Sequence, residues 1–187
     1  MMKIYGNLTS PFVRHCRIVL LQSAFPYQFI ETDMIHIGQI SPIKKMPLLM
    51  DGDLTLTDSS SILKYLHEKS GSPFMPDLRD FELFNMTNTI MDACVNLYVM
   101  KKMDNITPEQ SQYLKRQKTR VISGLEALNE IDLDMSLGLS DGKLRLACFL
   151  DWGIYSDFIN LKKLNNLSRF LDLVRQNKFF IQTCPPM

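Results

Sequence analysis

The chain has 187 residues, enough for one large or two small domains whose core needs no disulfide or metal. Hydrophobic residues make up 45% of the sequence and the formal net charge is +1, so nucleic-acid binding driven by phosphate neutralisation is not expected. The sequence shows neither a secretory apolar segment nor a run that could cross a bilayer, so we expect a cytoplasmic protein with no membrane partner.

Strand and helix patterns alternate in the first part of the chain. Residues 34–43 are weakly patterned and indicate one helical turn and a loop, whereas Asp51-Gly52 strongly favours a hairpin turn. The pattern predicts the order βαβαββα, which is the thioredoxin-like plan. The predicted elements span residues 3–7, 11–24, 27–31, 34–43, 47–50, 54–56 and 59–71.

Strand signals end after a cluster of Gly, Ser and Pro residues at 71–76, which we interpret as a linker. Apolar residues then recur at helical spacing to the end of the chain, which predicts an all-α bundle. The predicted helices cover residues 81–103, a stretch starting at 107, 144–155 and 164–174. The expected domains are therefore residues 1–71, with mixed α/β structure, and residues 78–187, which are helical.

The cysteines and histidines are dispersed and form neither a Cys-x-x-Cys pair nor a set at metal-ligand spacing. We therefore expect free thiols in or near the core and no metal site. The residues concerned are Cys16, Cys94, Cys148, Cys184, His15, His36 and His67.

Ser10 and Pro11 follow the first predicted strand and open the first predicted helix. Pro is favoured in the first helical turn, where free backbone N–H groups and the positive end of the helix dipole attract anions. A hydroxyl at this point can donate to an anion, although a plain helix cap explains Ser10 equally well. Cysteine is absent from positions 10 and 13, so dithiol exchange is excluded there.

Two further motifs follow at the start of later elements. Residues 45–47, Lys-Met-Pro, enter the third predicted strand, and Asp58-Ser59 opens the third predicted helix. Each is unremarkable alone, because Lys45 reads as a solvated side chain and Asp-Ser is a common helix start. Three such motifs in this order across a βαβαββα plan are a more specific indication of function than any one of them.

Together these motifs resemble the glutathione-binding domain of the cytosolic glutathione S-transferases. The resemblance continues through the helical half, in residues 92–93, 124–128, 142–151 and 180–186, which look like those of small bacterial members. It implies a glutathione transferase that uses a serine, with glutathione as co-substrate and no other cofactor. It also implies a homodimer, favoured further by an excess of apolar residues at Leu78, Phe81, Leu83, Phe84 and Met86.

The resemblance assigns roles to individual residues. Ser10 would stabilise the glutathione thiolate, with Thr9 as the alternative donor. Lys45, Met46 and Pro47 would contact the peptide, the Met46–Pro47 bond being cis so that the Met46 backbone pairs with it. Ser59 would hold the γ-glutamyl carboxylate and Asp58 its ammonium group.

A small electrophile would occupy an acceptor pocket that the sequence defines only loosely. Thr9 and Phe12 are candidates because they flank the proposed thiolate, and Tyr98 is a weaker one, since aromatic residues at helical spacing usually belong to the core.

Two departures from the family pattern stand out: a short region that favours a non-catalytic rival, and a half-complete capping box that bears on stability. The region between residues 31 and 47 is short, and Lys143 stands where an acidic residue would complete a capping box begun by Ser140. A non-catalytic scaffold resembling stringent-starvation proteins that contact RNA polymerase, or a glutathione-dependent isomerase or reductase, are the rival interpretations.

Overall fold

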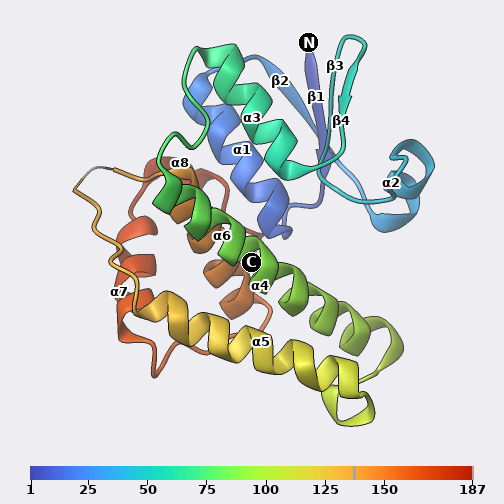
Figure 1. The fold of residues 1–187 in the computed structure, drawn as a ribbon. Helices are drawn as coiled ribbons and strands as arrows, with labels where there is room; N and C mark the ends of the chain where they lie inside the picture. The colour runs from blue at the N-terminus through green and yellow to red at the C-terminus, as the bar shows by residue number, and fades with distance from the viewer. Residues whose placement is uncertain (137, 187) are drawn as a thin grey trace. The chain divides into compact units, whose positions relative to one another are not determined.

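The computed structural model describes residues 1–136 and 138–186, which form two compact units (Figure 1). Unit 1 consists of Met1–Pro76 and Arg175–Met187, and unit 2 of Asp77–Val174. The helical domain expected from the sequence runs from residue 78 to residue 187. The C-terminal tail instead groups with the N-terminal unit.

Unit 1 is built on a four-stranded mixed sheet with the order β2-β1-β3-β4. β1 (Met2–Gly6) pairs in parallel with β2 (Tyr27–Glu31) and antiparallel with β3 (Leu48–Asp51), which forms a hairpin with β4 (Leu54–Leu56). Side chains on one face of β1 are buried, as the alternation of Met2 and Ile4 with Lys3 shows. The predicted thioredoxin-like order is confirmed.

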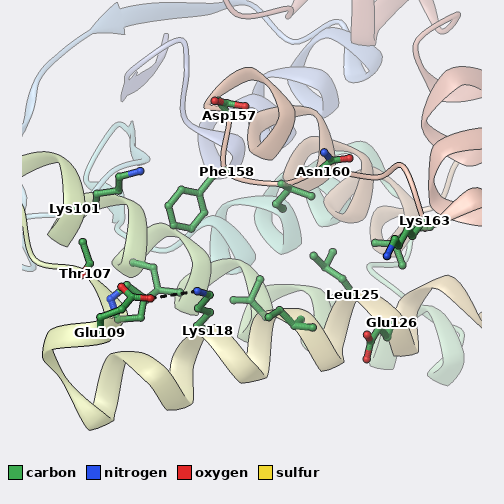
Figure 2. A pocket seen from close by; sticks show the side chains of 16 residues that line it. Lys101, Thr107, Glu109, Lys118, Leu125, Glu126, Asp157, Phe158, Asn160 and Lys163 are labelled. Carbon is green, nitrogen blue, oxygen red and sulfur yellow. Dashed lines mark ion pairs between the residues drawn. The ribbon is translucent and has the colours of Figure 1, made fainter.

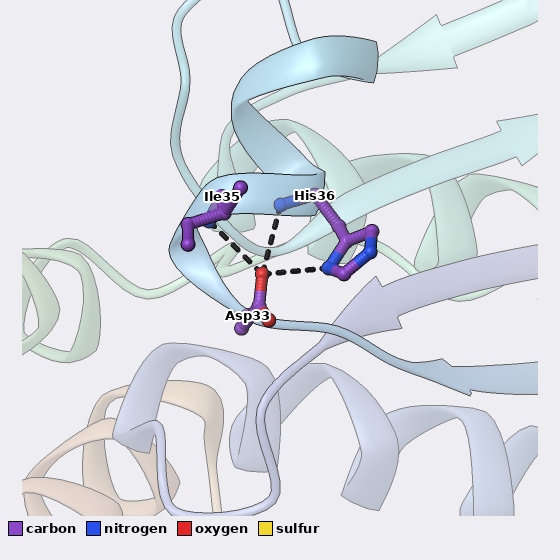
Figure 3. A network of polar contacts seen from close by, with 3 residues as sticks. All are labelled: Asp33, Ile35 and His36. Carbon is purple, nitrogen blue, oxygen red and sulfur yellow. Dashed lines mark hydrogen bonds and ion pairs between the residues drawn. The ribbon is translucent and has the colours of Figure 1, made fainter.

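Three helices of the first 76 residues accompany this sheet. α1 (Pro11–Ser23) and α3 (Ser59–Ser70) lie side by side and bury apolar residues, while α2 (Met34–Ile40) stands apart from them (Figure 1). α2 is longer than the single turn that was predicted. Asp33 starts it by accepting the N–H groups of Ile35 at 3.0 Å and His36 at 2.8 Å (Figure 3).

The C-terminal tail is held by a buried arginine of α1. Arg14 is only 2% exposed, and its Nη2 donates to the carbonyl of Phe180 at 2.9 Å. Its guanidinium also lies 3.7 Å from the centroid of the Phe180 ring. These contacts explain why α8 (Lys178–Gln182), a short helix that the sequence analysis did not predict, belongs to unit 1.

Unit 2 consists of helices whose apolar faces meet on α6. Of the 15 residues of α6, only three are not buried, so α6 forms the centre of this unit. The described helices are α4 (Leu78–Asp104), the 3₁₀ turn η1 (Pro108–Gln110), α5 (Gln112–Asn129), α6 (Asp141–Tyr155) and α7 (Asn165–Val174). In the described residues no helix is both long and apolar enough to span a membrane.

The apolar excess at the start of α4 divides into two groups. Leu83 and Phe84, expected at a subunit interface, instead belong to the core of unit 2, where they are 6% and 1% exposed. The reason is that both lie on the face of α4 that packs within the unit. Leu78 and Phe81 remain exposed.

The N-terminus of α6 is completed by a residue from α4. Ser140 caps the helix by accepting the N–H of Lys143 at 3.5 Å, but Lys143 cannot return a bond. Asp80 supplies a different acceptor, since both its carboxylate oxygens lie 3.2 Å from the Gly142 nitrogen and one accepts from the Ser140 hydroxyl. A Cβ at Gly142 would come within 2.6 Å of the Asp80 carbonyl oxygen, so this approach requires glycine.

A polar cluster fastens the β3–β4 hairpin to α3. The Asp51 carboxylate accepts from the Tyr65 hydroxyl at 2.6 Å and from Lys69 Nζ at 2.8 Å. The hydrogen bond from Lys69, followed by that from Tyr65, lowers the pKa of Asp51 below its ordinary value.

We predict that Asp80→Ala lowers the free energy of unfolding by about 1–3 kcal/mol, because the buried Gly142 N–H loses its acceptor. Lys143→Glu in the same background should recover part of the loss by completing the local capping box. Urea unfolding measures both, with Glu82→Gln on the exposed side of α4 as the control. A loss no larger than that of the control would contradict the role given to Asp80.

The lowered pKa of Asp51 predicts a pH-dependent contribution to stability. Because the carboxylate is the bonded form, the contribution is present above the ordinary aspartate pKa of about 3.9 and is lost as pH falls through the folded value. The difference in urea midpoint between the wild type and Asp51→Asn should therefore narrow as pH falls below about 4 and close once pH is below the lowered pKa of Asp51. Asp53→Asn, in the exposed turn, is the control. A difference that persists in acid would rule out the linkage.

Candidate functional site

Ser10 caps α1 at the end of β1. Its backbone is extended, its Oγ accepts the N–H of Val13 at 3.4 Å, and its carbonyl accepts the N–H of Arg14 at 2.9 Å. The bond to Val13 uses only a lone pair of the Ser10 oxygen. The hydroxyl proton itself is donated to no described residue. Ser10 therefore offers a proton at the positive end of a helix of 13 residues.

Thr9, the alternative donor, is already committed. Its hydroxyl donates to Asn7 Oδ1 at 2.7 Å, and its backbone N–H donates to the same oxygen at 2.8 Å. The Asn7 side chain thus stabilises the turn between β1 and α1 by hydrogen bonding, and the Thr9 hydroxyl proton is used in one of these bonds. Sequence reasoning did not single out Asn7, although an asparagine directly after a strand is a recognised turn signal.

Residues 45–47 reach this turn through a methionine. The Met46–Pro47 peptide bond is cis, as the resemblance predicted, and the Asn7 N–H donates to Met46 Sδ at 3.3 Å. Pro47 is buried at the entry to β3, whereas Lys45 is exposed. The structure therefore brings the first two predicted motifs together.

The third motif starts α3, as predicted. Asp58 is the N-cap, with Oδ1 accepting the N–H of Ser60 at 2.7 Å, and no described residue bonds to its other carboxylate oxygen. Ser59 is 4% exposed, and its carbonyl accepts from the Cys16 thiol of α1 at 3.9 Å. The motif thus lies alongside α1, beyond its first turn.

A pocket opens next to the turn that holds Asn7. It has a volume of about 570 Å³ and runs between the ends of β1 and β2 and the helix α2. Its lining includes Asn7, Asp33 and His36, whose Nδ1 lies 2.9 Å from Asp33 Oδ1 (Figure 3). Although the region before Pro47 is short, it still supplies a helix that lines this pocket.

The residues expected at the acceptor pocket are divided between the two units. Thr9 and the half-buried Phe12 lie in unit 1. Tyr98 lies in unit 2, where its ring packs edge-on against Trp152 at 5.5 Å and Phe158 at 6.0 Å, and its hydroxyl accepts from Lys102 at 3.0 Å. Tyr98 thus belongs to an aromatic cluster of unit 2.

The described residues indicate no metal site, and three of the cysteines are buried. Among residues 1–136 and 138–186, no group of three or more His, Cys, Asp or Glu side chains could hold a metal ion. Burial raises the pKa of the Cys94 thiol to about 12, which keeps it protonated at neutral pH, and Cys16 is buried inside α1.

Comparison with known proteins identifies the first unit. Residues 4–74 match the family model for the glutathione S-transferase N-terminal domain. An uncharacterized GST-like protein of Escherichia coli K12, YibF, is 28% identical over 149 residues, covering 73% of this chain and 72% of that protein. Human glutathione S-transferase theta-1 is 35% identical over 79 residues, but these cover only 38% of this chain and 33% of the human protein.

The whole fold also has a counterpart among solved structures. A glutathione transferase family member from Pseudomonas fluorescens Pf-5, crystallised with bound glutathione, superposes with a TM-score of 0.87 and 21% identity over 100% of both chains. That likeness shows a common fold that includes the helical unit. The family match itself is carried by residues 4–74, which resemble the N-terminal domain of the glutathione S-transferases.

Proposed function

We propose that this protein is a glutathione transferase in which Ser10 stabilises the thiolate of bound glutathione for attack on a small electrophile. The observation that carries the proposal is the state of the two hydroxyls in the β1–α1 turn. Ser10 caps α1 and keeps a proton to donate, whereas Thr9 donates its proton to Asn7.

The chemistry follows from the position of Ser10. A hydroxyl donor and a helix N-terminus both favour a thiolate over a thiol, which lowers the thiol pKa from about 8.5 toward neutrality. The thiol proton passes to solvent, and the thiolate sulfur then forms a bond to an electrophilic carbon. In a substitution the leaving group departs with its electron pair, and in an addition the product carbanion takes a proton from water.

The rest of the glutathione molecule would be held by the other two motifs. The Met46 backbone would pair with the peptide, and Lys45 and Pro47 flank that contact. The N–H groups at the start of α3, with Ser59, suit the γ-glutamyl carboxylate, and the free oxygen of Asp58 suits its ammonium group. The bound glutathione in the Pseudomonas fluorescens structure supports this use of the fold.

We predict that Ser10→Ala removes most of the thiolate signal of bound glutathione at neutral pH and reduces turnover with it. The lost bond to a charged sulfur is worth about 1.5–3 kcal/mol, or roughly one to two pKa units. Glutathione affinity should stay within a few-fold, because Met46, Asp58 and Ser59 remain. Ultraviolet difference spectra of the complex measure ionisation, and calorimetry measures affinity.

Two control variants separate donation from helix capping. Ser10→Asp keeps an acceptor for the Val13 N–H, so stability should hold, but it cannot donate and it repels a thiolate. Thr9→Ala should leave the thiolate signal largely intact, since the Thr9 proton already serves Asn7. If Thr9→Ala abolishes the signal and Ser10→Ala does not, Thr9 is the donor.

Binding and activity measurements on the wild-type protein distinguish the rival functions. A scaffold protein would not be retained on immobilised glutathione or would show no thiolate signal when it binds. An isomerase or reductase would bind and ionise glutathione but fail to conjugate generic electrophiles. Conjugation of a chloronitrobenzene with loss of chloride supports transfer, and its absence across several electrophile classes would contradict it.

We also propose that the protein is a homodimer. Leu78 and Phe81, on the first turns of α4, are 78% and 43% exposed, and such apolar side chains favour an interface. Light scattering should give twice the mass of one chain, and Leu78→Glu with Phe81→Glu should give the mass of one. Leu173→Glu, at an exposed leucine of α7, is the control. A single-chain mass for the wild type at micromolar concentration would overturn the proposal.

A further inference from the structure

Hydrogen bonds from both the backbone and the side chain of Asn7 define the turn between β1 and α1. The Asn7 N–H donates to Met46 Sδ at 3.3 Å, and the Asn7 carbonyl accepts the N–H of Ser10 at 3.1 Å. The side-chain oxygen accepts the N–H of Thr9 at 2.8 Å and the hydroxyl of Thr9 at 2.7 Å. An asparagine that bonds in this way closes an Asx turn, in which the side chain mimics a backbone turn.

The direction of the Asn7 amide follows from these bonds. A backbone N–H can only donate, so the group that faces Thr9 must be the amide oxygen Oδ1 and not the amide nitrogen. That oxygen carries no hydrogen, and the Thr9 hydroxyl lies 2.7 Å from it. The Thr9 hydroxyl must therefore give its proton to Asn7, which leaves it only lone pairs to offer to a ligand.

Ser10, the next residue of the turn, is in the opposite state. Its Oγ accepts the N–H of Val13 at 3.4 Å, so the bond uses a lone pair and the proton is kept. Thr9 and Ser10 are both half-buried and both carry a hydroxyl. The acceptor that Asn7 presents to one of them is therefore what makes the two hydroxyls differ as donors.

We propose that Asn7 is a positioning residue that selects Ser10 as the donor to bound glutathione, by holding the proton of a latent second donor, Thr9. The inference rests on the proposed function, because it concerns the thiolate that Ser10 is proposed to stabilise. Its physical basis is that a hydroxyl carries one proton, so the proton that Thr9 gives to Asn7 cannot also be given to sulfur.

A double-mutant cycle between Asn7 and Ser10 tests the inference. The readout is the ultraviolet absorbance of the glutathione thiolate at neutral pH, with the full chain saturated by glutathione. Ser10→Ala alone should lower the thiolate fraction roughly ten-fold or more, the effect of one bond to a charged sulfur. Asn7→Ala combined with Ser10→Ala should then give about three-fold more thiolate than Ser10→Ala alone, because Thr9 is released and donates in its place.

Further variants identify the substitute donor. Adding Thr9→Ala to the Asn7→Ala and Ser10→Ala pair should remove the gain. Asn7→Ser keeps a weaker acceptor for the same kind of turn, so with Ser10→Ala it should give a smaller gain in the same direction. A gain of thiolate is informative because a loosened fold could only lose signal, and Asn7→Ser supplies the test if Asn7→Ala does not fold.

Two control substitutions separate selection from stability, each combined with Ser10→Ala. Asn177 caps α8 in the same unit, and its Oδ1 accepts backbone N–H groups at 2.9 and 3.3 Å, so Asn177→Ala removes a comparable pair of bonds. Lys118→Gln breaks the ion pair that Lys118 forms with Glu109 at a pocket of unit 2 (Figure 2). Neither control should raise the thiolate fraction.

Three results would overturn the inference. The Asn7→Ala and Ser10→Ala pair shows no more thiolate than Ser10→Ala alone; Asn177→Ala produces the same gain; or the gain survives the addition of Thr9→Ala. In each case the wild type still ionises glutathione, so the proposed function stands. Failure of the proposed function looks different, because the wild type itself then gives no thiolate signal, and the role of Asn7 falls with it.

Discussion

The junction between β1 and α1 is the constraint on which the rest of unit 1 depends. A Cβ on Gly6 would lie 2.5 Å from a methyl group of Val13, so only glycine lets the end of β1 approach the first turn of α1 this closely. Asn7 then ties the turn through Thr9 and contacts Met46, and Ser10 caps the helix. The same backbone geometry thus closes the fold and leaves one hydroxyl proton at a helix N-terminus.

α1 also anchors the end of the chain, through a charge that is costly to bury. A guanidinium at 2% exposure is tolerated only when its donors are bonded, and Arg14 bonds to the carbonyl of Phe180 and lies over its ring. The start of α1 therefore holds two polar side chains in different states: Ser10 keeps a hydroxyl proton to donate, and Arg14 is bonded to the tail. An arginine close to a proposed thiolate need not be a ligand contact, because here its donors serve the protein itself.

Unit 2 is organised around α6 by a contact that crosses 60 residues of sequence. Asp80 accepts the Gly142 N–H and the Ser140 hydroxyl, so a carboxylate of α4 satisfies a backbone donor in the first turn of α6. A helix as buried as α6 cannot leave a terminal N–H without a partner, because water does not reach it.

The sequence by itself determined the features that arise within a short stretch of chain. Periodicity predicted the sheet, α1, α3 and the helices of unit 2, and Pro11 and Asp58 marked two helix starts, because these signals depend on neighbouring residues. Only the tertiary structure decided which hydroxyl keeps its proton, since that depends on the orientation of Asn7. The tertiary structure alone also showed that α8 packs on α1 and that Asp80 bonds to the start of α6. These features join residues far apart in the chain, and no local pattern encodes the distance between two distant side chains.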